Sequence, residues 1–516
     1  MHSPSTPDTE VLIVGAGPTG LVLALWLTRL GVRVRVIDKT AEPGTTSRAL
    51  AVQARTLELY GQVGLADEVV RRGRRVAAAN LWVAGRQVAR AAFGNMGAGI
   101  SPYPFALVFP QDEHERLLID RLAEVGVHVE RRTELLHFED ASGHVLARLK
   151  RSDGTLEMCE AAYLAGCDGA RSAVREALKI GFPGGTYSHL FYVADVEASG
   201  AVMNGEVHVA LDRNDFLALF PLKDEGRARL VGTVREDARN QQENMSWDDV
   251  SKRVIKWMRI DVARVNWFST YRVHHRVANR FRKGRQFLLG DAAHIHSPVG
   301  GQGMNTGIGD AVNLAWKLAA VLHGRADAAI LDSYEMERIG FANRLVATTD
   351  QAFTGVTSPG PIARTLRLHI LPFLVPSLFA FRTTRRFMFR TVSQTAVNYR
   401  GSTLSQGRAG RLHGGDRLPW VKTSSNDNYM PLRSLDWQVH VYGDAKPEVR
   451  ALCEQRRLPL HVLGWRREMG RSGLRRDAVY LVRPDGYLTV VDREGRAEAL
   501  ISYLDAHQIK NPISVY

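Results

Sequence analysis

The sequence predicts an α/β fold in which a parallel sheet flanked by helices is interleaved with a β-rich domain and followed by a small α/β domain. Three observations predict this arrangement. A βαβ unit opens the chain, β-rich segments with aromatic residues run from about Tyr187 to Tyr271, and a mixed helix and strand pattern returns after Gly415. The class is therefore α/β with more than one domain.

The βαβ unit consists of an apolar run at Val11–Val14, a glycine turn, a helical segment at Leu21–Leu30 and an alternating strand at Val32–Ile37. A later strand at Phe287–Gly290 leads through a glycine-rich loop into a long helix from Met304 to Leu322. Between them lie helical patterns at 54–60 and 113–125 and strand-like alternation at 127–129, 144–149 and 163–165. Because the same kind of pattern returns after the β-rich region, the first domain is predicted to be discontinuous.

The length of 516 residues exceeds what one hydrophobic core supports, about 250–300 residues. We therefore predict three domains. Residues 1–180 and 285–398 form the first, with part of 76–110 contributing to the β-rich domain at 181–284. A connector at 401–415, rich in Gly, Arg, Ser and Thr, precedes the C-terminal domain at 416–516, which has a helical pattern at 446–455.

Composition excludes several classes of protein. Hydrophobic residues make up 45% and charged residues 24%, as in ordinary globular proteins. The net charge is +14, but the arginines are scattered and form no dense basic tail, so we expect no nucleic-acid partner. Only Cys159, Cys167 and Cys453 are present, an odd number without a C-x-x-C pair, which is typical of a reducing compartment. The polar start at Met1–Glu10 does not resemble a signal peptide, and a cytoplasmic location is expected.

One apolar stretch, His369–Phe381, is interrupted by Pro372 and Pro376 and is shorter than the roughly 20 residues that span a bilayer. We expect a packed helix and no stable membrane insertion. Its basic flanks leave a helix lying on a membrane surface as the alternative.

The first chemical motif is Gly15-Ala16-Gly17-Pro18-Thr19-Gly20, set between a strand and a helix. Glycines in this pattern give a tight turn, close approach of the backbone to a pyrophosphate, and close packing of helix on strand. An acidic residue ends the next strand, where it can accept hydrogen bonds from a ribose. The motif predicts a dinucleotide, either NAD(P) or FAD. The residues expected to hold it are Gly15, Gly17, Pro18, Thr19, Gly20, Asp38 and Lys39.

Two later motifs decide between these cofactors. They are Gly166–Arg175, with the sequence GCDGARSAVR, and Gly290–Asn305, with the sequence GDAAHIHSPVGGQGMN. With the first motif, they make the chain resemble the single-component FAD-dependent aromatic hydroxylases, the group of p-hydroxybenzoate, phenol and aromatic polyketide hydroxylases. The resemblance covers essentially the whole chain. It implies a Rossmann-like FAD-binding domain interleaved with a β-sheet substrate domain, and a thioredoxin-like C-terminal domain, here without C-x-x-C and with Cys453 alone.

The resemblance implies bound FAD, with Asp291 at the ribityl chain and Pro298 beside the reactive edge of the isoalloxazine ring. The loop containing Gly301 and Gly303 opens the long helix. Its N–H groups and helix dipole can stabilise negative charge near flavin N1 and C2=O. The residues expected there are Gly301, Gly303, Met304 and Asn305.

Other positions match family contacts less specifically. Asp168 lies in a motif associated with FAD and nicotinamide binding, and Arg171 and Arg175 are either cations for phosphate or surface arginines. Arg48 resembles an arginine beside the flavin, and Gln111 resembles a glutamine that reaches the cofactor. Either could instead be an ordinary surface residue. Arg48 and Pro298 are the residues expected in the catalytic flavin environment, and no general base is assigned.

The resemblance implies that NAD(P)H reduces FAD, that O2 then gives a C4a-hydroperoxyflavin, and that one oxygen atom is transferred to an aromatic, phenolic or polyketide-like substrate. No second G-x-G-x-x-G is present, so NAD(P)H is expected to dock transiently. The absence of a redox cysteine pair argues against a disulfide reductase, and the absence of W-x-W-x-I-P argues against a halogenase. Baeyer–Villiger oxidation, epoxidation or dehydrogenation on the same scaffold stay open. So does a flavin-binding scaffold or redox sensor without turnover.

The substrate is expected between the β-rich domain and the loop of the Gly290–Asn305 motif, which we call the flavin loop. That domain's aromatic residues include Tyr187, Phe191, Tyr192, Phe216 and Phe220, without indication of which contact substrate. His294 and His296 have no carboxylate or cysteine cluster beside them in the sequence, so no metal site is expected. A homodimer is an open expectation.

Overall fold

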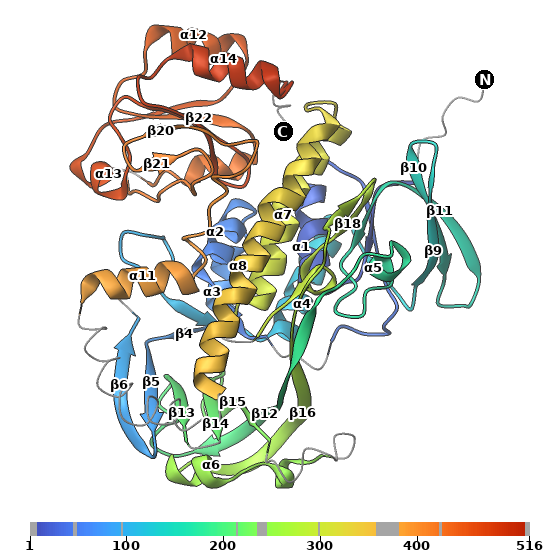
Figure 1. Cartoon of the computed structure of the whole chain (residues 1–516), viewed down its shortest axis with the longest axis vertical. Helices are drawn as coiled ribbons and strands as arrows, with labels where there is room; N and C mark the ends of the chain where they lie inside the picture. The colour runs from blue at the N-terminus through green and yellow to red at the C-terminus, as the bar shows by residue number, and fades with distance from the viewer. Residues whose placement is uncertain are drawn as a thin grey trace.

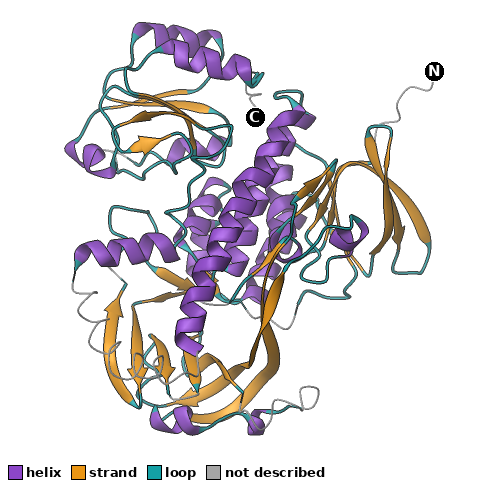
Figure 2. Cartoon of the chain, in the orientation of Figure 1, coloured by secondary structure: helices purple, strands orange, loops and turns teal. Residues whose placement is uncertain are grey.

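The computed structural model describes residues 8–44, 49–93, 96–212, 215–234, 245–297, 300–357, 381–422 and 426–510, with the backbone alone at 188–189 and 350–357. Three large sheets, one small sheet and a central group of long helices make up the described part of the molecule (Figures 1 and 2). The first sheet and the helices lie in the middle, the second sheet forms one end, and the third forms the other.

The first sheet has a parallel core in the order β18-β11-β1-β2-β8. Its central strand β1 is buried on both faces because helices cover the sheet, which explains its continuous apolar sequence. The antiparallel strands β9 and β10 pair with the long β11, and β17 pairs with β18 at the other edge. The strands are β1 (Thr9–Val14), β2 (Val34–Asp38), β8 (Val129–Arg131), β9 (Glu134–Ala141), β10 (His144–Lys150), β11 (Leu156–Gly166), β17 (Arg282–Lys283) and β18 (Gln286–Leu288).

The helix α1 packs against both α4 and α7 beside this sheet. It starts at the glycine turn that follows β1, so its N-terminus lies at the carboxyl end of that strand, where open α/β sheets bind ligands. A small sheet in the order β3-β7-β4 lies nearby. The elements are α1 (Pro18–Arg29), α2 (Ala54–Gln62), α3 (Ala66–Arg72), α4 (Gln111–Glu124), α5 (Ala173–Ala177), α7 (Gly303–Leu322), α8 (Asp332–Thr357), α11 (Arg382–Val392), β3 (Ala51–Val52), β4 (Arg74–Val76) and β7 (Ala106–Val108).

The second sheet has eight strands in the order β19-β16-β12-β15-β14-β13-β5-β6 and is antiparallel except where β13 runs parallel to β5. The short strand β19 immediately follows the Gly290–Asp291 turn, so this sheet is joined directly to the flavin loop. Its elements are β5 (Ala78–Val83), β6 (Arg86–Ala92), β12 (Gly184–Ser199), β13 (Val207–Leu211), β14 (Phe216–Pro221), β15 (Arg227–Thr233), β16 (Asp261–Val277), β19 (His294–Ile295) and α6 (Arg253–Trp257).

The third sheet has the order β21-β20-β25-β24-β22-β23, with β22 parallel to β23 and antiparallel to β24. The succession β22, α12, β23, α13, β24, β25, α14 is that of a thioredoxin-like domain. Its elements are β20 (Gln406–Ala409), β21 (Leu412–His413), β22 (Gln438–Tyr442), α12 (Pro447–Gln455), β23 (Leu460–Leu463), α13 (Arg467–Ser472), β24 (Val479–Val482), β25 (Leu488–Asp492) and α14 (Ala497–Ala506).

The hydrophobic core continues from the central helices into the C-terminal domain. Trp316 on α7 packs edge-on against Trp437, with ring centroids 5.5 Å apart. Within the described ranges no helix is long and apolar enough to cross a membrane. The apolar stretch His369–Phe381, apart from its last residue, lies outside the described residues.

Candidate flavin site

Two glycines of the first motif are required by close backbone contacts. Gly15 has φ of +106°, and a Cβ there would lie 2.4 Å from the carbonyl oxygen of Cys167. A Cβ on Gly20 would lie 2.0 Å from the carbonyl oxygen of Gly15. The absence of side chains therefore lets α1 approach β1 and brings the first motif against the second.

Gly17 is different, because nothing in the described structure would contact a side chain there. It has φ of −78°, which any residue can adopt, and no atom lies within 4 Å of its ideal Cβ position. Pro18 follows at the first helical position of α1, where its missing N–H costs nothing. The open backbone at a helix N-terminus fits a pyrophosphate.

Asp38 at the end of β2 is fixed beside the glycine turn. Its Oδ2 accepts a hydrogen bond of 2.7 Å from the N–H of Ala16. Its Oδ1 accepts from the N–H and the hydroxyl of Thr40, at 2.8 and 2.6 Å. The carboxylate is thus held at the position expected for a ribose contact, whereas Lys39 is exposed to solvent.

The second motif places Asp168 next to the first motif. Its Oδ2 accepts from the N–H of Val174 at 3.2 Å, while its buried Oδ1 makes no hydrogen bond within the described part of the chain. Burial raises the pKa of this carboxyl. Arg171 is exposed, but Arg175 donates to the carbonyls of Ala170 and Ala292, each at 3.0 Å. Arg175 therefore ties the second motif to the third and does not project as a phosphate cation.

The third motif meets the first at Thr19. A Cβ on Gly290, which has φ of +57°, would lie 2.7 Å from Thr19 Oγ1, and one on Gly307 would lie 2.2 Å from the same oxygen. The N-termini of α1 and α7 are therefore neighbours. Asp291, one residue after Gly290, is exposed at this junction.

The side-chain amide of Asn305 makes hydrogen bonds through both its oxygen and its nitrogen, at the end of the flavin loop. Its Oδ1 accepts from the N–H of Gln53 and the hydroxyl of Thr56, at 2.8 and 2.7 Å. Its Nδ2 donates to the carbonyls of Ala51 and Gly301, at 2.8 and 2.9 Å. Asn305 is 1% exposed, so it supports the start of α7 from below.

At the start of α7, Gly303 has only ordinary contacts with the described residues. The nearest atoms to a Cβ on Gly303 belong to the His296 ring, at 3.9 Å, and Met304 is half-buried. Burial lowers the pKa of His296 to about 4, so the ring is neutral near pH 7. The Nδ1 of His296 lies 2.8 Å from the carbonyl oxygen of Ser297. Its buried Nε2 and the buried hydroxyl of Ser297 are without hydrogen bonds among the described atoms.

Three other site predictions concern neighbouring segments. Gln111 begins α4 and donates from Nε2 to Glu115 Oε1 at 2.8 Å. Glu115 Oε2 in turn accepts from the N–H of Gly44 at 3.2 Å, which links α4 to the loop after β2. Arg48 and Pro298 lie outside the described residues.

The structure adds a buried ion pair, Asp310 with Arg338, that the motifs did not indicate. Asp310 on α7 accepts from the N–H of Gly290 at 2.9 Å, and its Oδ2 lies 2.7 Å from His294 Nε2. Arg338 on α8 donates from Nε to Asp310 Oδ1 at 2.6 Å. Burial opposes ionisation of Asp310, but Arg338 and His294 outweigh it and hold the pKa of Asp310 below its usual range. One signal was available: Asp310 and Lys317 are the only charged residues in α7 and lie seven apart, on one helix face.

The second sheet sorts the aromatic residues by face. Tyr192 packs with Phe268 and with residues of α6 on one face of the sheet, here called the outer face. The helix α6 lies at the end of the molecule, away from α7 (Figure 1). Phe220 packs with Leu50, Val76 and Val108 and joins this sheet to the small sheet. The other three predicted aromatic residues, Tyr187, Phe191 and Phe216, form a separate cluster on the inner face, together with Tyr271 and Val273.

This inner cluster is the candidate substrate surface. Phe191 lies 6.3 Å from Phe216 and 6.0 Å from Tyr271 between ring centroids. Phe216 and Tyr271 are only half-buried, unlike Phe191. Tyr271 lies on β16, whose last residues Arg276 and Val277 pair with β19 of the flavin loop. Tyr271 was missed from sequence because it lies at the predicted end of the β-rich region.

The residues present fit FAD. Two helix N-termini lie side by side, and each carries a glycine. Among the described residues nothing would contact a Cβ on Gly17, and a Cβ on Gly303 would make only ordinary contact with the His296 ring, at 3.9 Å. A fixed carboxylate, Asp38, lies beside the first, and Asp291 lies between them. A long ligand with an anionic middle could therefore lie from the end of β2 to the start of α7.

Comparisons with known proteins agree with this geometry. The family described as "FAD binding domain" matches residues 8–349. 6-Methylpretetramide 4-monooxygenase of Streptomyces rimosus is 39% identical over 413 residues, covering 78% of this chain and 72% of that protein. Rifampicin monooxygenase of Rhodococcus hoagii is 33% identical over 416 residues, covering 76% and 79%.

Solved structures extend the similarity to the whole chain. OxyS, an anhydrotetracycline hydroxylase from Streptomyces rimosus, has a TM-score of 0.78 and 27% identity. The match covers 98% of this chain and 100% of OxyS. CabE, an aromatic hydroxylase from angucycline biosynthesis, has a TM-score of 0.74 and 28% identity, covering 96% and 99%. The predicted fold class and bound cofactor are confirmed. The chain belongs to the FAD-dependent aromatic hydroxylases and is a monooxygenase of that family.

Proposed function

We propose that this monooxygenase hydroxylates a polycyclic phenolic compound of the polyketide type, held against the inner face of the second sheet. The observation that carries the proposal is the separate aromatic cluster there, with Phe216 and Tyr271 only half-buried. Flat aromatic substrates stack on such rings. The names of the relatives support the same class, since they include 6-methylpretetramide 4-monooxygenase and an anhydrotetracycline hydroxylase.

The proposed FAD site runs from the first motif to the start of α7. Gly17 and the N-terminus of α1 take the pyrophosphate, Asp38 takes the adenosine ribose, and Asp291 takes the ribityl chain. Gly301–Asn305 would hold the isoalloxazine ring, and Arg48 and Pro298 would contribute to its surroundings, as the family resemblance implies. When bound, FAD supplies the electron transfer from NAD(P)H and the activation of O2.

The protein's own contribution is binding, orientation and exclusion of water. The positive dipole end at the N-terminus of α7 would stabilise negative charge on the reduced ring. His296 is neutral near pH 7, so it would add no positive charge of its own to that of the helix N-terminus. The aromatic cluster orients the ring to be hydroxylated and keeps water from the reacting centre. A phenolate substrate would supply its own activation, so no general base is assigned.

NAD(P)H is proposed to dock transiently at the surface. The sequence has one G-x-G-x-x-G, which the FAD site uses. Arg171 is exposed beside Asp168 and is a suitable cation for a nicotinamide-nucleotide phosphate.

A cytoplasmic location is proposed from the thiols. Cys159, Cys167 and Cys453 are buried and free, as expected in a reducing compartment. A homodimer is proposed with it, to be tested by light scattering at several concentrations.

The function is tested by measuring NAD(P)H consumption with a panel of compounds. We expect polycyclic phenols to accelerate consumption and to gain one oxygen atom, as seen by product mass. Acceleration by non-aromatic ketones with ester products would favour Baeyer–Villiger oxidation. Flavin that binds tightly but is not reduced with any compound would favour a scaffold or sensor.

A further inference from the structure

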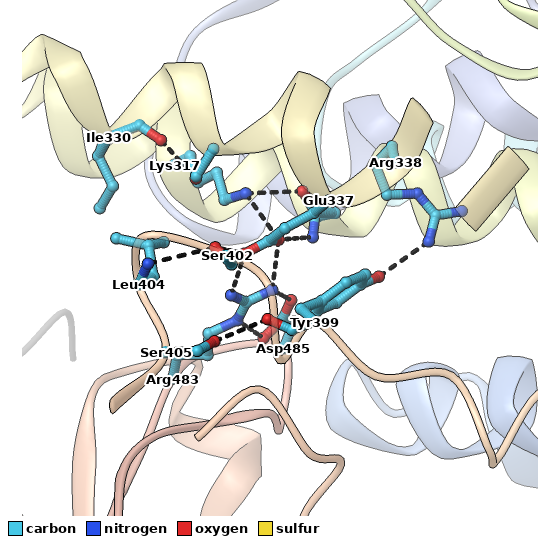
Figure 3. A network of polar contacts seen from close by, with 12 residues as sticks. Lys317, Ile330, Glu337, Arg338, Tyr399, Ser402, Leu404, Ser405, Arg483 and Asp485 are labelled. Carbon is cyan, nitrogen blue, oxygen red and sulfur yellow. Dashed lines mark hydrogen bonds and ion pairs between the residues drawn. The ribbon is translucent and has the colours of Figure 1, made fainter. Parts of the chain in front are cut away.

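A buried ionic cluster fastens the C-terminal domain to the central helices (Figure 3). Arg483, at the end of β24, donates to Glu337 Oε1 and Oε2 on α8 at 2.7 and 2.9 Å. It also donates to both carboxylate oxygens of Asp485, at 2.7 and 2.8 Å. The side chains of Arg483 and Glu337 are both 0% exposed. The contact is therefore part of the interior.

The cluster is closed by α7 and the connector. Lys317 on α7 donates to Glu337 Oε2 at 2.9 Å, and the hydroxyl of Ser402 donates to Glu337 Oε1 at 2.7 Å. Burial lowers the pKa of Lys317 to about 8, whereas Arg483 and Lys317 together overcome burial and hold the pKa of Glu337 well below its usual range. Removing one member would leave a buried charge without its partner, so the domain is held in one position.

Arg338, which follows Glu337 on α8, connects Tyr399 to Asp310 beside the flavin loop. Arg338 donates from Nη1 to the hydroxyl of Tyr399 at 2.8 Å and from Nε to Asp310 Oδ1 at 2.6 Å. The ring of Tyr399 lies 4.4 Å from that of Tyr487 and 5.0 Å from the Arg483 guanidinium carbon. Tyr399 thus contacts the C-terminal domain through its ring and Arg338 through its hydroxyl.

Asp310 completes the route, because its other oxygen accepts from the N–H of Gly290 at 2.9 Å, next to Asp291. A second route runs through α2. Arg55 donates to the carbonyl of Asp485 at 2.6 Å. At the start of the same helix, Gln53 donates from Nε2 to the carbonyl of Gly300 at 2.9 Å. Gly290 is therefore linked to the C-terminal domain through the chain of contacts that ends at Tyr399. Gly300 is linked to it through the start of α2.

We propose that the C-terminal domain is a positioning element for FAD, which sets the loop of Asp291 through Tyr399, Arg338 and Asp310. This role needs no thiol chemistry, and burial of Cys453 raises its pKa to about 11. The inference rests on the proposed placement of FAD at this loop. Arg338 and Tyr399 are positioning residues, since they act on the loop through Asp310.

The test compares two conservative substitutions in the full-length holoenzyme. Tyr399→Phe keeps the ring and its packing but removes the hydroxyl that accepts from Arg338. Tyr442→Phe is the matched control, because Tyr442 is also buried and its hydroxyl accepts from Asn428 Nδ2 at 2.7 Å inside the C-terminal domain, on neither route. For each, FAD affinity is measured by fluorescence titration of the apoprotein, and thermal unfolding is measured separately.

We expect Tyr399→Phe to weaken FAD binding about fivefold, the factor for loss of one hydrogen bond, and to raise the share of NAD(P)H that ends as H2O2. Both variants should lower the thermal unfolding midpoint by a similar amount, because each loses one buried hydrogen bond. Tyr442→Phe, however, should leave FAD affinity unchanged. Equal FAD affinity in the two variants overturns the proposal. Asp291→Ala, measured alongside, separates the causes: if it also keeps full FAD affinity, the placement of FAD at this loop is itself wrong.

Discussion

Arg338 Nε lies 2.6 Å from Asp310 Oδ1, in a contact whose side chains are 3% and 0% exposed. The pair joins α8 to α7 behind the loop that carries Asp291. Buried charges are tolerated only when paired and hydrogen-bonded, so Asp310 cannot leave Arg338 without a large cost. The position of the loop is thereby linked to the packing of two long helices.

The first-motif glycines should separate cofactor binding from folding. Gly17→Ala places a methyl group where the described structure is open, so we expect unchanged stability of the apoprotein and FAD affinity at least about tenfold weaker. Gly20→Ala drives a Cβ against the carbonyl of Gly15 and should impair folding itself. Thermal unfolding of apoprotein and FAD titration check both. Normal FAD affinity in Gly17→Ala would place the pyrophosphate elsewhere.

Asp291 should contribute to FAD retention and little to stability, because it is exposed. We expect Asp291→Asn to lower the flavin content of purified protein by weakening FAD binding roughly tenfold, the loss of one charge-assisted hydrogen bond. Asp120→Asn, on the exposed side of α4, is the control and should keep full flavin content. The ratio of flavin to protein absorbance decides the matter, and equal ratios would contradict the assignment.

The inner face of the second sheet should determine substrate affinity. Phe216→Leu removes one half-buried ring of the cluster, and we expect the KM for an aromatic substrate to rise about fivefold through lost stacking. Phe268→Leu is the control, since Phe268 is also half-buried but stacks on Tyr192 at the outer face. Steady-state kinetics with NAD(P)H in excess compare them. A KM that rises in the control but not in Phe216→Leu would move the substrate off the inner face.

Stability should fall between about pH 7 and pH 5. Burial lowers the pKa of His114 and His440 to about 3 and that of His296 to about 4. Below the ordinary value of 6.5 the unfolded chain takes up protons on these rings and the folded chain does not. Each ring then costs about 1.4 kcal/mol per pH unit. Asp436, whose burial raises its pKa to about 6, acts in the opposite sense, as do the buried carboxyls of Glu113, Glu115 and Asp168, whose pKa values burial also raises. Burial likewise lowers the pKa of His208, His461 and His507, so these rings act in the same sense as the first three.

The unfolding midpoint, measured by calorimetry at both pH values, checks this expectation. A midpoint that stays constant or rises on acidification would show that these histidines are not buried as neutral rings.

Sequence patterns could predict the parts of the fold that depend on local chemistry. The glycine turn, the strand before it and the helix after it follow from residues within one βαβ unit, and α7 begins at Gly303, one residue before the predicted Met304. The thioredoxin-like domain was expected from resemblance and is present in the third sheet. The cofactor was predicted because three motifs occur in a fixed order.

The long-range contacts could not be predicted in this way. Asp310 and Arg338 are 28 residues apart, and Glu337 and Arg483 are 146 apart, so no periodicity connects them. Arg175 was considered as a phosphate cation because charge alone does not reveal that backbone carbonyls surround it. The division of aromatic residues between two sheet faces required the strand register.

The most direct test of the account is turnover under 18O2 with a polycyclic phenol that accelerates NAD(P)H consumption. We expect the product to carry one labelled oxygen atom on the aromatic ring, and turnover in labelled water under ordinary O2 to leave it unlabelled. A product whose new oxygen comes from water, or consumption of NAD(P)H with H2O2 as the sole product for every aromatic compound tested, would contradict the assignment as an aromatic hydroxylase.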